Sequence, residues 1–273
     1  MGKVFAWHEV EAGHIPHRTD FTQVVHRIRT DVEGADALVG GVLCGSVLWG
    51  GASERSDIDC VLFYNPRMRK EAFGAMRSMG AAAAVRHVPL ELIPLAADMA
   101  PTYAHHLNLL FVKHLERSVK QGGLLKKNLL LLLSFSPHTS ALLDTREYLR
   151  RKMRTMEKGL AALPVMETAA RHKFFQKVLE VPVHIARKML AVNGAEVESE
   201  AKRDIMRAYR AAASPCEWAL ASRLTATDSA YTRELLAQRK KPDERRYGDA
   251  LEEVEARAWD ALEFVRLSVS RIA

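Results

Sequence analysis

The feature that most constrains the fold is a change in sequence pattern about halfway along the chain. Up to about residue 128, helix-like and strand-like stretches alternate, with glycines at the junctions. After about Pro137 the sequence is almost wholly helix-like, with few glycines and apolar residues at helical spacing. Such a change predicts an α+β domain followed by an all-α bundle. We therefore expect one domain at 1–128 and a second at 129–273.

The expected first domain contains short strands separated by helices, an order typical of a small mixed β-sheet with flanking helices. Asp20 is a good N-cap for a helix that reaches about Val32. Pro66 is well placed to open a helix that reaches about Met79. The chain contains neither a GxGxxG nor a P-loop sequence, so a doubly wound domain is not expected. Strands are expected at 37–44, 58–64 and 88–94, with a helix that includes Leu107 and Leu115, and a short edge strand at Leu124-Leu125.

The expected second domain is a bundle of helices with polar or proline-containing junctions. Pro164 ends the first of these helices, and Asn193-Gly194 is a good C-cap pair for the second. The helices are expected at about 140–163, 166–192, 198–213, 215–223, 229–239 and 242–272.

The charge and cysteine content limit the classes of partner. Lys and Arg number 40 against 33 Asp and Glu, which gives a formal net charge of +7. This excess favours anionic partners such as nucleotides, RNA or DNA, although a solvated basic surface explains it equally well. Three cysteines (Cys44, Cys60 and Cys216) without a CxxC spacing argue against a disulfide framework or a zinc site.

No stretch of the sequence has the composition of a membrane anchor or a secretory signal. The most apolar run, Leu129–Leu133, is far too short to span a bilayer. The first residues lack the long apolar core of a signal peptide. We expect a soluble cytoplasmic protein with no membrane partner. The sequence is compatible with a homodimer.

Two carboxylates at the start of the second expected strand carry the strongest chemical signal. Asp57 and Asp59 are two residues apart, so their side chains lie on the same face of the sheet, about 6–7 Å apart at Cα. Ile58 points the opposite way, into the face that helices cover. Carboxylates this close repel each other unless a cation neutralises them, and hard oxygen ligands suit Mg²⁺, with Mn²⁺ as an alternative.

Two further features complete the predicted site. Glu91 lies between Leu90 and Leu92 in the third expected strand, where an unpaired carboxylate is costly. If that strand neighbours the second, three carboxylates converge in the arrangement needed for two-ion catalysis. Gly45-Ser46 ends the first expected strand, where a glycine permits close backbone approach to a phosphate and the Ser46 hydroxyl binds phosphate oxygens.

Gly45-Ser46, ten intervening residues, and then Asp57-Ile58-Asp59 resemble the signature of the DNA polymerase β-type nucleotidyltransferase superfamily. Ser56-Asp57-Ile58-Asp59 resembles especially the small bacterial and archaeal members, although Trp49-Gly50 stands where many of them have Arg-Gly. The resemblance covers about residues 20 to 128. The helical remainder is similar, in layout only, to the C-terminal bundle of kanamycin-type enzymes.

The resemblance implies an enzyme that transfers a nucleoside monophosphate from an NTP, with ATP as the first candidate, to an acceptor hydroxyl. Asp57, Asp59 and Glu91 would be the catalytic and metal-binding residues of a Mg²⁺ site, and Gly45 and Ser46 would bind the nucleotide. By analogy with lysines in the helical domains of relatives, Lys173 or Lys177 would reach the triphosphate.

The acceptor and the catalytic status stay open at the level of sequence. A small molecule such as an aminoglycoside, a protein side chain and an RNA 3′ end all fit, and the absence of a recognisable RNA-binding appendage disfavours RNA. The alternative to an enzyme is a non-catalytic nucleotide-binding, regulatory or antitoxin-like module on the same fold.

Overall fold

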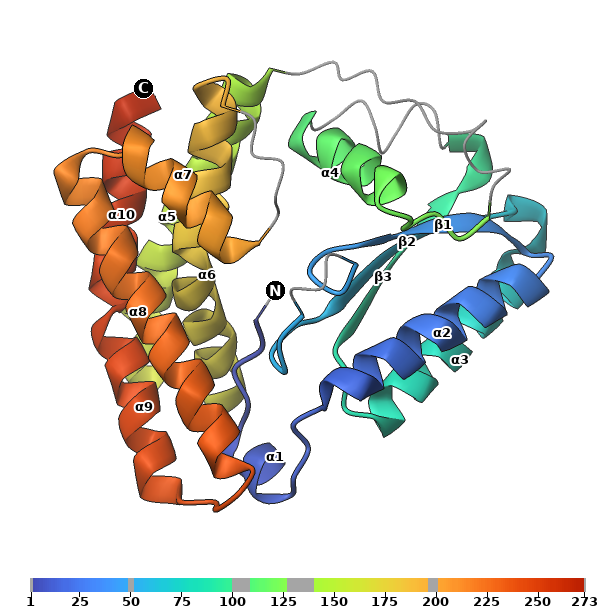
Figure 1. Ribbon diagram of the computed structural model, residues 1–273, viewed down its shortest axis with the longest axis horizontal. Coiled ribbons are helices and arrows are strands. Elements are labelled where there is room, and N and C mark those ends of the chain that lie inside the picture. Colours follow the sequence, from blue (N-terminus) through green and yellow to red (C-terminus); the bar gives the residue numbers. More distant parts are fainter. Residues whose placement is uncertain (1, 49–51, 100–108, 127–139, 196–200, 273) are drawn as a thin grey trace. The chain divides into compact units, whose positions relative to one another are not determined.

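The computed structural model describes residues 2–48, 52–99, 109–126, 140–195 and 201–272. The chain forms two compact units (Figure 1). We call Pro16–Ser140 the sheet unit, and residues 1–15 together with 141–273 the helical unit. The fold is mostly helical with one small mixed sheet, as an α+β layout requires.

The sheet has the order β1-β2-β3, formed by β1 (Leu38–Cys44), β2 (Ile58–Tyr64) and β3 (Leu90–Ala96). β1 runs antiparallel to β2, and β2 runs parallel to β3. The third strand begins and ends two residues later than the sequence predicted. Where a short edge strand was expected, Leu124 forms an isolated antiparallel bridge with Val42 on β1.

Helices cover both faces of this sheet (Figure 1). One face packs against α2 and α3 through a core that includes Ile28, Ile58 and Met79. The other face packs against α4, with Phe63 and Leu115 in its core. The helices of the unit are α2 (Arg18–Gly34), α3 (Arg69–Val85) and α4 (Leu109–Lys120), with short 3₁₀ turns at Pro66–Met68 and Ala97–Met99. Leu107 lies outside the described residues.

The start of α2 differs from the sequence prediction. His17 is the N-cap residue, three positions before Asp20. The Asp20 carboxylate instead accepts a hydrogen bond from the His17 backbone N–H at 2.6 Å. Asp20 therefore caps the helix from its first turn, as the acidic half of a capping box does.

The helical unit contains α1 (Trp7–Glu11), α5 (Ala141–Ala162), α6 (Thr168–Val192), α7 (Lys202–Ala212), α8 (Pro215–Gln238), α9 (Glu244–Ala256) and α10 (Ala258–Ile272), with a 3₁₀ turn at Leu163–Val165. The helix expected from residue 198 is described from Lys202. The helix expected over 242–272 is divided at Arg257 into α9 and α10.

α8 is continuous where the sequence predicted two helices separated by a polar stretch. The Thr225 and Ser229 hydroxyls donate to the carbonyls of Ala221 and Thr225, four residues earlier, at 2.8 and 3.0 Å. Because these side chains bond back to the helix, they do not compete with its backbone ladder.

The first residues of the chain pack in the helical unit, although the sequence placed them in the first domain. Phe5 is fully buried. Its N–H donates to the Tyr231 hydroxyl at 3.2 Å, and its carbonyl accepts from the Tyr247 hydroxyl at 2.7 Å. The two hydroxyls lie 2.6 Å apart, so Tyr231 donates to Tyr247. These long-range bonds have no local sequence signature.

No helix in the described part of the chain combines the length and apolar composition that a bilayer crossing requires.

Candidate functional site

Asp57, Asp59 and Glu91 come together at one end of the sheet. Each offers a carboxylate oxygen, and the three oxygens lie within 4.8 Å of one another. Asp59 and Glu91 are register partners on the parallel strands β2 and β3, and Asp57 directly precedes β2. The prediction that the Glu91 strand neighbours the Asp57–Asp59 strand is therefore confirmed.

The backbone explains why these side chains converge. Ile58 is fully buried in the core against α2 and α3. Because successive side chains of a strand alternate between faces, Asp59 points to the opposite side. Asp57 and Asp59 are half-buried, and Glu91 is exposed. A buried isoleucine thus fixes the direction of the carboxylate that follows it.

Three carboxylates in this space repel one another and favour a bound cation. Two unit charges about 4 Å apart interact with about 1 kcal/mol in water and several times more near a protein surface. Hard divalent cations are held by carboxylate oxygens, usually with waters completing the shell. A group of three carboxylates with partial exposure can therefore hold a metal ion.

Gly45 is required by the backbone next to this group. Its φ is +83°, a conformation that side chains other than glycine rarely adopt. A Cβ at this position would lie 3.1 Å from Asp59 Oδ2. Cys44, just before it, is the register partner of Asp59. Glycine thus lets the turn after β1 pass directly against the carboxylate of Asp59.

The Ser46 hydroxyl is held by a serine that the sequence analysis did not single out as a site residue. Ser46 Oγ donates to Ser56 Oγ at 3.0 Å, and the Ser53 N–H donates to the same oxygen at 2.9 Å. Ser56 is buried. These bonds join the two ends of the connection between β1 and β2. The sequence marked Ser56 only as part of the Ser56-Asp57-Ile58-Asp59 resemblance, without a role for its hydroxyl. Trp49-Gly50 lies outside the described residues.

Arg55 is a second residue that the sequence did not mark. Its exposed fraction is only 2%, and it is among the largest side chains that are buried in the described residues. It stands two residues before Asp57, so the connection carries a desolvated positive charge close to the carboxylate group along the chain. A buried guanidinium is costly without anionic or polar partners.

Lys173 and Lys177 lie one turn apart on α6 in the helical unit, and both side chains are exposed. Their role in phosphate binding stays a prediction. Two other lysines, Lys188 on α6 and Lys152 on α5, are half-buried. Lys188 Nζ lies 4.4 Å and Lys152 Nζ 5.8 Å from the ring centroid of Tyr148.

Burial shifts the pKa values of this cluster, which we call the lysine–tyrosine cluster (Tyr148, Lys152, Lys188). Desolvation lowers the pKa of Lys188 to about 8, and nearby Arg187 and Arg151 act in the same direction. Desolvation also lowers the pKa of Lys152 and raises that of Tyr148. The sequence signal was the i, i+4 spacing of Tyr148 and Lys152, which is too common on helices to select them.

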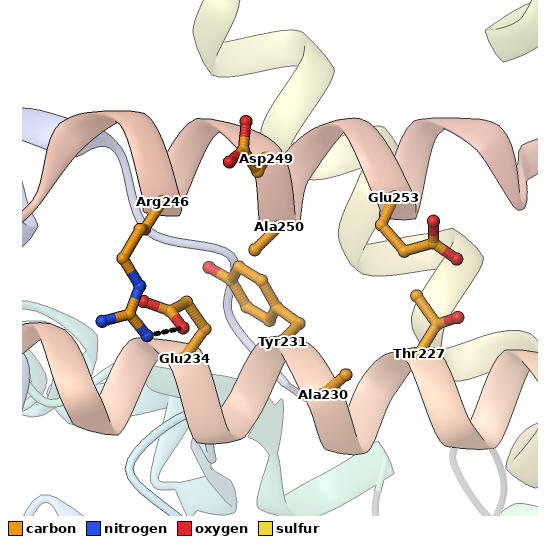
Figure 2. Close-up of a pocket in the computed structure, with 8 residues that line it drawn as sticks. All are labelled: Thr227, Ala230, Tyr231, Glu234, Arg246, Asp249, Ala250 and Glu253. Atoms are coloured by element: carbon orange, nitrogen blue, oxygen red, sulfur yellow. Dashed lines mark hydrogen bonds and ion pairs between the residues drawn. The ribbon is translucent and has the colours of Figure 1, made fainter.

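A shallow cavity of about 340 Å³ lies between α8 and α9 of the helical unit (Figure 2). An ion pair of 2.8 Å between Arg246 and Glu234 crosses it, and Asp249 and Glu253 line its α9 side. The ring of Tyr231 forms part of its floor. Acidic and apolar residues dominate this lining, so the cavity does not offer the cations that a triphosphate needs.

Comparison with known proteins does not identify a family. No protein-family model matches the chain, and no curated protein is significantly similar to it. The carboxylate group and the Gly45-Ser46 turn therefore carry the functional interpretation on their own geometry.

Proposed function

We propose that the protein is a metal-dependent nucleotidyltransferase that moves a nucleoside monophosphate from an NTP to an acceptor hydroxyl. The observation that carries the proposal is the convergence of Asp57, Asp59 and Glu91 within 4.8 Å, beside a Gly-Ser turn that passes against Asp59.

The residues of the site divide the work. Asp57, Asp59 and Glu91 would hold Mg²⁺, or Mn²⁺ in its place. Bound Mg²⁺ neutralises the triphosphate and makes the attacking hydroxyl more acidic. Gly45 leaves room for a phosphate at the turn. The Ser46 hydroxyl, which donates to Ser56 Oγ in this structure, would turn its hydrogen to a phosphate oxygen. Ser56 would then act as a positioning residue by donating its own hydroxyl hydrogen to Ser46 Oγ.

The bond changes of the transfer are simple. The acceptor oxygen forms a bond to the α-phosphorus, the bond from that phosphorus to the bridging oxygen breaks, and pyrophosphate leaves. Glu91, the exposed carboxylate of the three, would accept the proton of the acceptor hydroxyl. Positioning and charge neutralisation supply most of the rate in such reactions.

The test uses each α-labelled NTP with the full chain, Mg²⁺ and cell lysate. We expect a label to appear on an acceptor and pyrophosphate to be released. The double variant Asp57→Asn/Asp59→Asn should lose transfer by at least about 10²–10³-fold, because its neutral amides no longer hold the cation. Full activity of a folded double variant would remove these residues from the mechanism. Calorimetric binding of Mg·NTP without pyrophosphate release would favour the non-catalytic module.

A further inference from the structure

The outward face of α5 carries a row of like charges without partners. Arg150, Arg154 and Lys158 are four residues apart and exposed. Within the described parts of the chain, none of the three has an ion pair or a hydrogen bond. Like charges at this spacing destabilise a helix, so the row is not explained by the stability of α5. We call these three residues the basic row.

The acidic residues of α5 interact with residues outside the basic row. Glu147 pairs with Arg151 at 3.7 Å, and Glu157 pairs with Arg266 of α10 at 3.4 Å. Asp144 is buried and acts electrostatically on Lys188. Glu147 and Glu157 each lie three residues from a member of the basic row, and yet the ion pairs that they form are with Arg151 and Arg266.

α6, which packs against α5, carries two further exposed lysines. Lys173 and Lys177 are exposed there, and neither has an ion pair among the described residues. Lys177 is close enough to Lys152 of α5 to lower its pKa. These lysines form a separate group, because Lys152 lies on the side of α5 that faces α6, whereas the basic row lies on the outward side.

The geometry of the row fits an extended anion. Successive charges are about 6 Å apart along the helix axis, because each residue adds 1.5 Å, and the row spans about 12 Å. A small anion would need donors that converge on one point, whereas these side chains project from a line. A phosphodiester backbone presents its charges along a line, and such backbones are bound chiefly by arginine and lysine.

We propose that the basic row, Arg150, Arg154 and Lys158, docks the phosphodiester backbone of a nucleic-acid strand. The further inference that this strand is the acceptor, through a terminal hydroxyl, rests on the proposed nucleotidyl transfer. The docking of the strand does not depend on that transfer. The sequence analysis had disfavoured RNA because no appendage for it was recognisable. The structure supplies a different reason to consider nucleic acid, since it places all three charges on the exposed side of α5 without an ion pair among the described residues.

The test measures binding of fluorescein-labelled RNA and DNA 20-mers of the same sequence to the full chain, without NTP, by fluorescence anisotropy across 50–200 mM KCl. Each lost phosphate contact reduces the slope of log K against log salt by about 0.7 for a single strand. The variant Arg150→Gln/Arg154→Gln/Lys158→Gln should therefore lose about 2 from the slope and weaken binding about tenfold or more at 50 mM salt.

A matched control removes the same charge from another surface. Arg233, Lys240 and Arg245 are exposed and have no ion pair among the described residues. Their triple Gln variant should keep the wild-type slope. Equal losses in both variants would mean that net charge alone drives binding, and an unchanged slope in the basic-row variant would show that the row does not dock nucleic acid. Either result overturns the proposal.

A second comparison separates this proposal from the proposed function. Asp57→Asn/Asp59→Asn should lose transfer and keep the salt slope, because the basic row lies on the helical unit. If wild-type protein shows a slope that depends on the row and yet transfers no nucleotide to the strand, docking stands and the strand is not the acceptor. RNA bound more tightly than DNA, with the same dependence on the row, would identify RNA as the strand.

Discussion

The two units place their polar clusters by different means. In the sheet unit, Asp57, Asp59 and Glu91 lie together for two reasons. Strand alternation sets the direction of their side chains, and the register of β2 and β3 pairs Asp59 with Glu91. In the helical unit, Lys152 and Lys188 meet over Tyr148 because two helices pack with a particular rotation. A cluster set by register is visible in short sequence spacings, whereas one set by helix packing is not.

Two glycines show the same difference. Gly45 of the sheet unit has a positive φ and lies beside a carboxylate, so its conformation serves the site. Gly159 of the helical unit is buried in α5, where an added Cβ would overlap the ring of Phe174 on α6. The first glycine leaves room for a polar group, and the second leaves room for core packing.

The largest expected effect is at Gly159. In an open helix position Gly→Ala stabilises by up to about 1 kcal/mol. Gly159→Ala should instead destabilise by about 2–3 kcal/mol, because the Phe174 ring must move. Urea unfolding measures this change, and Gly248→Ala on α9, where nothing lies within 4 Å of the added Cβ, is the matched control. A stabilised Gly159→Ala protein would contradict the packing of α5 on α6.

Tyr247→Phe tests the tie between the first residues and the helical unit. The variant loses the bonds to the Phe5 carbonyl and the Tyr231 hydroxyl, which should cost about 1–3 kcal/mol of unfolding free energy. Tyr64→Phe in the sheet unit, whose hydroxyl makes no hydrogen bond to the described residues, should change stability by less than about 0.5 kcal/mol. Equal stability of the two variants would show that the first residues do not belong to the core of the helical unit.

Lys188 tests the lysine–tyrosine cluster by its pH dependence. Its pKa in the folded protein is about 8, so between pH 8 and the unfolded value of 10.5 the unfolded chain binds more protons. Stability from this group therefore rises with pH in that window. Lys188→Met should stabilise the protein by about 1–2 kcal/mol at pH 7, and the gain should shrink by pH 10. A gain that is equal at both pH values would argue against an enclosed ammonium.

The smallest expected change in stability is at Gly45. Gly45→Ala must hold an alanine at positive φ, which costs about 1 kcal/mol. Its added Cβ also displaces the Asp59 carboxylate. Mn²⁺ affinity should therefore fall about tenfold while the protein stays folded. Gly13→Ala, at a φ of +72° with nothing within 4 Å, shares the backbone cost and should leave Mn²⁺ affinity unchanged.

The sequence predicted the convergence of Asp57, Asp59 and Glu91 better than the details of the fold. Asp57, Asp59 and Glu91 were predictable because alternation, a buried Ile58 and the spacing from Gly45-Ser46 are all local. Ser56 and Arg55 were not, since their roles depend on how the connection after β1 folds back on itself. The sequence did not predict that α8 is continuous. The Thr225 and Ser229 hydroxyls bond to carbonyls of their own helix, and the polar composition of this stretch does not reveal those bonds. The place of the first residues depended on Tyr231 and Tyr247, far along the chain.

The central claim is that Asp57, Asp59 and Glu91 form one metal centre. The most direct test is titration of Mn²⁺ into the full chain, followed by electron paramagnetic resonance, for the wild type and for Asp57→Asn/Asp59→Asn. We predict saturable loss of the free Mn²⁺ signal with the wild type, competition by Mg²⁺, and at least about a hundredfold weaker binding by the variant. Equal Mn²⁺ binding by the wild type and a folded double variant would contradict the claim.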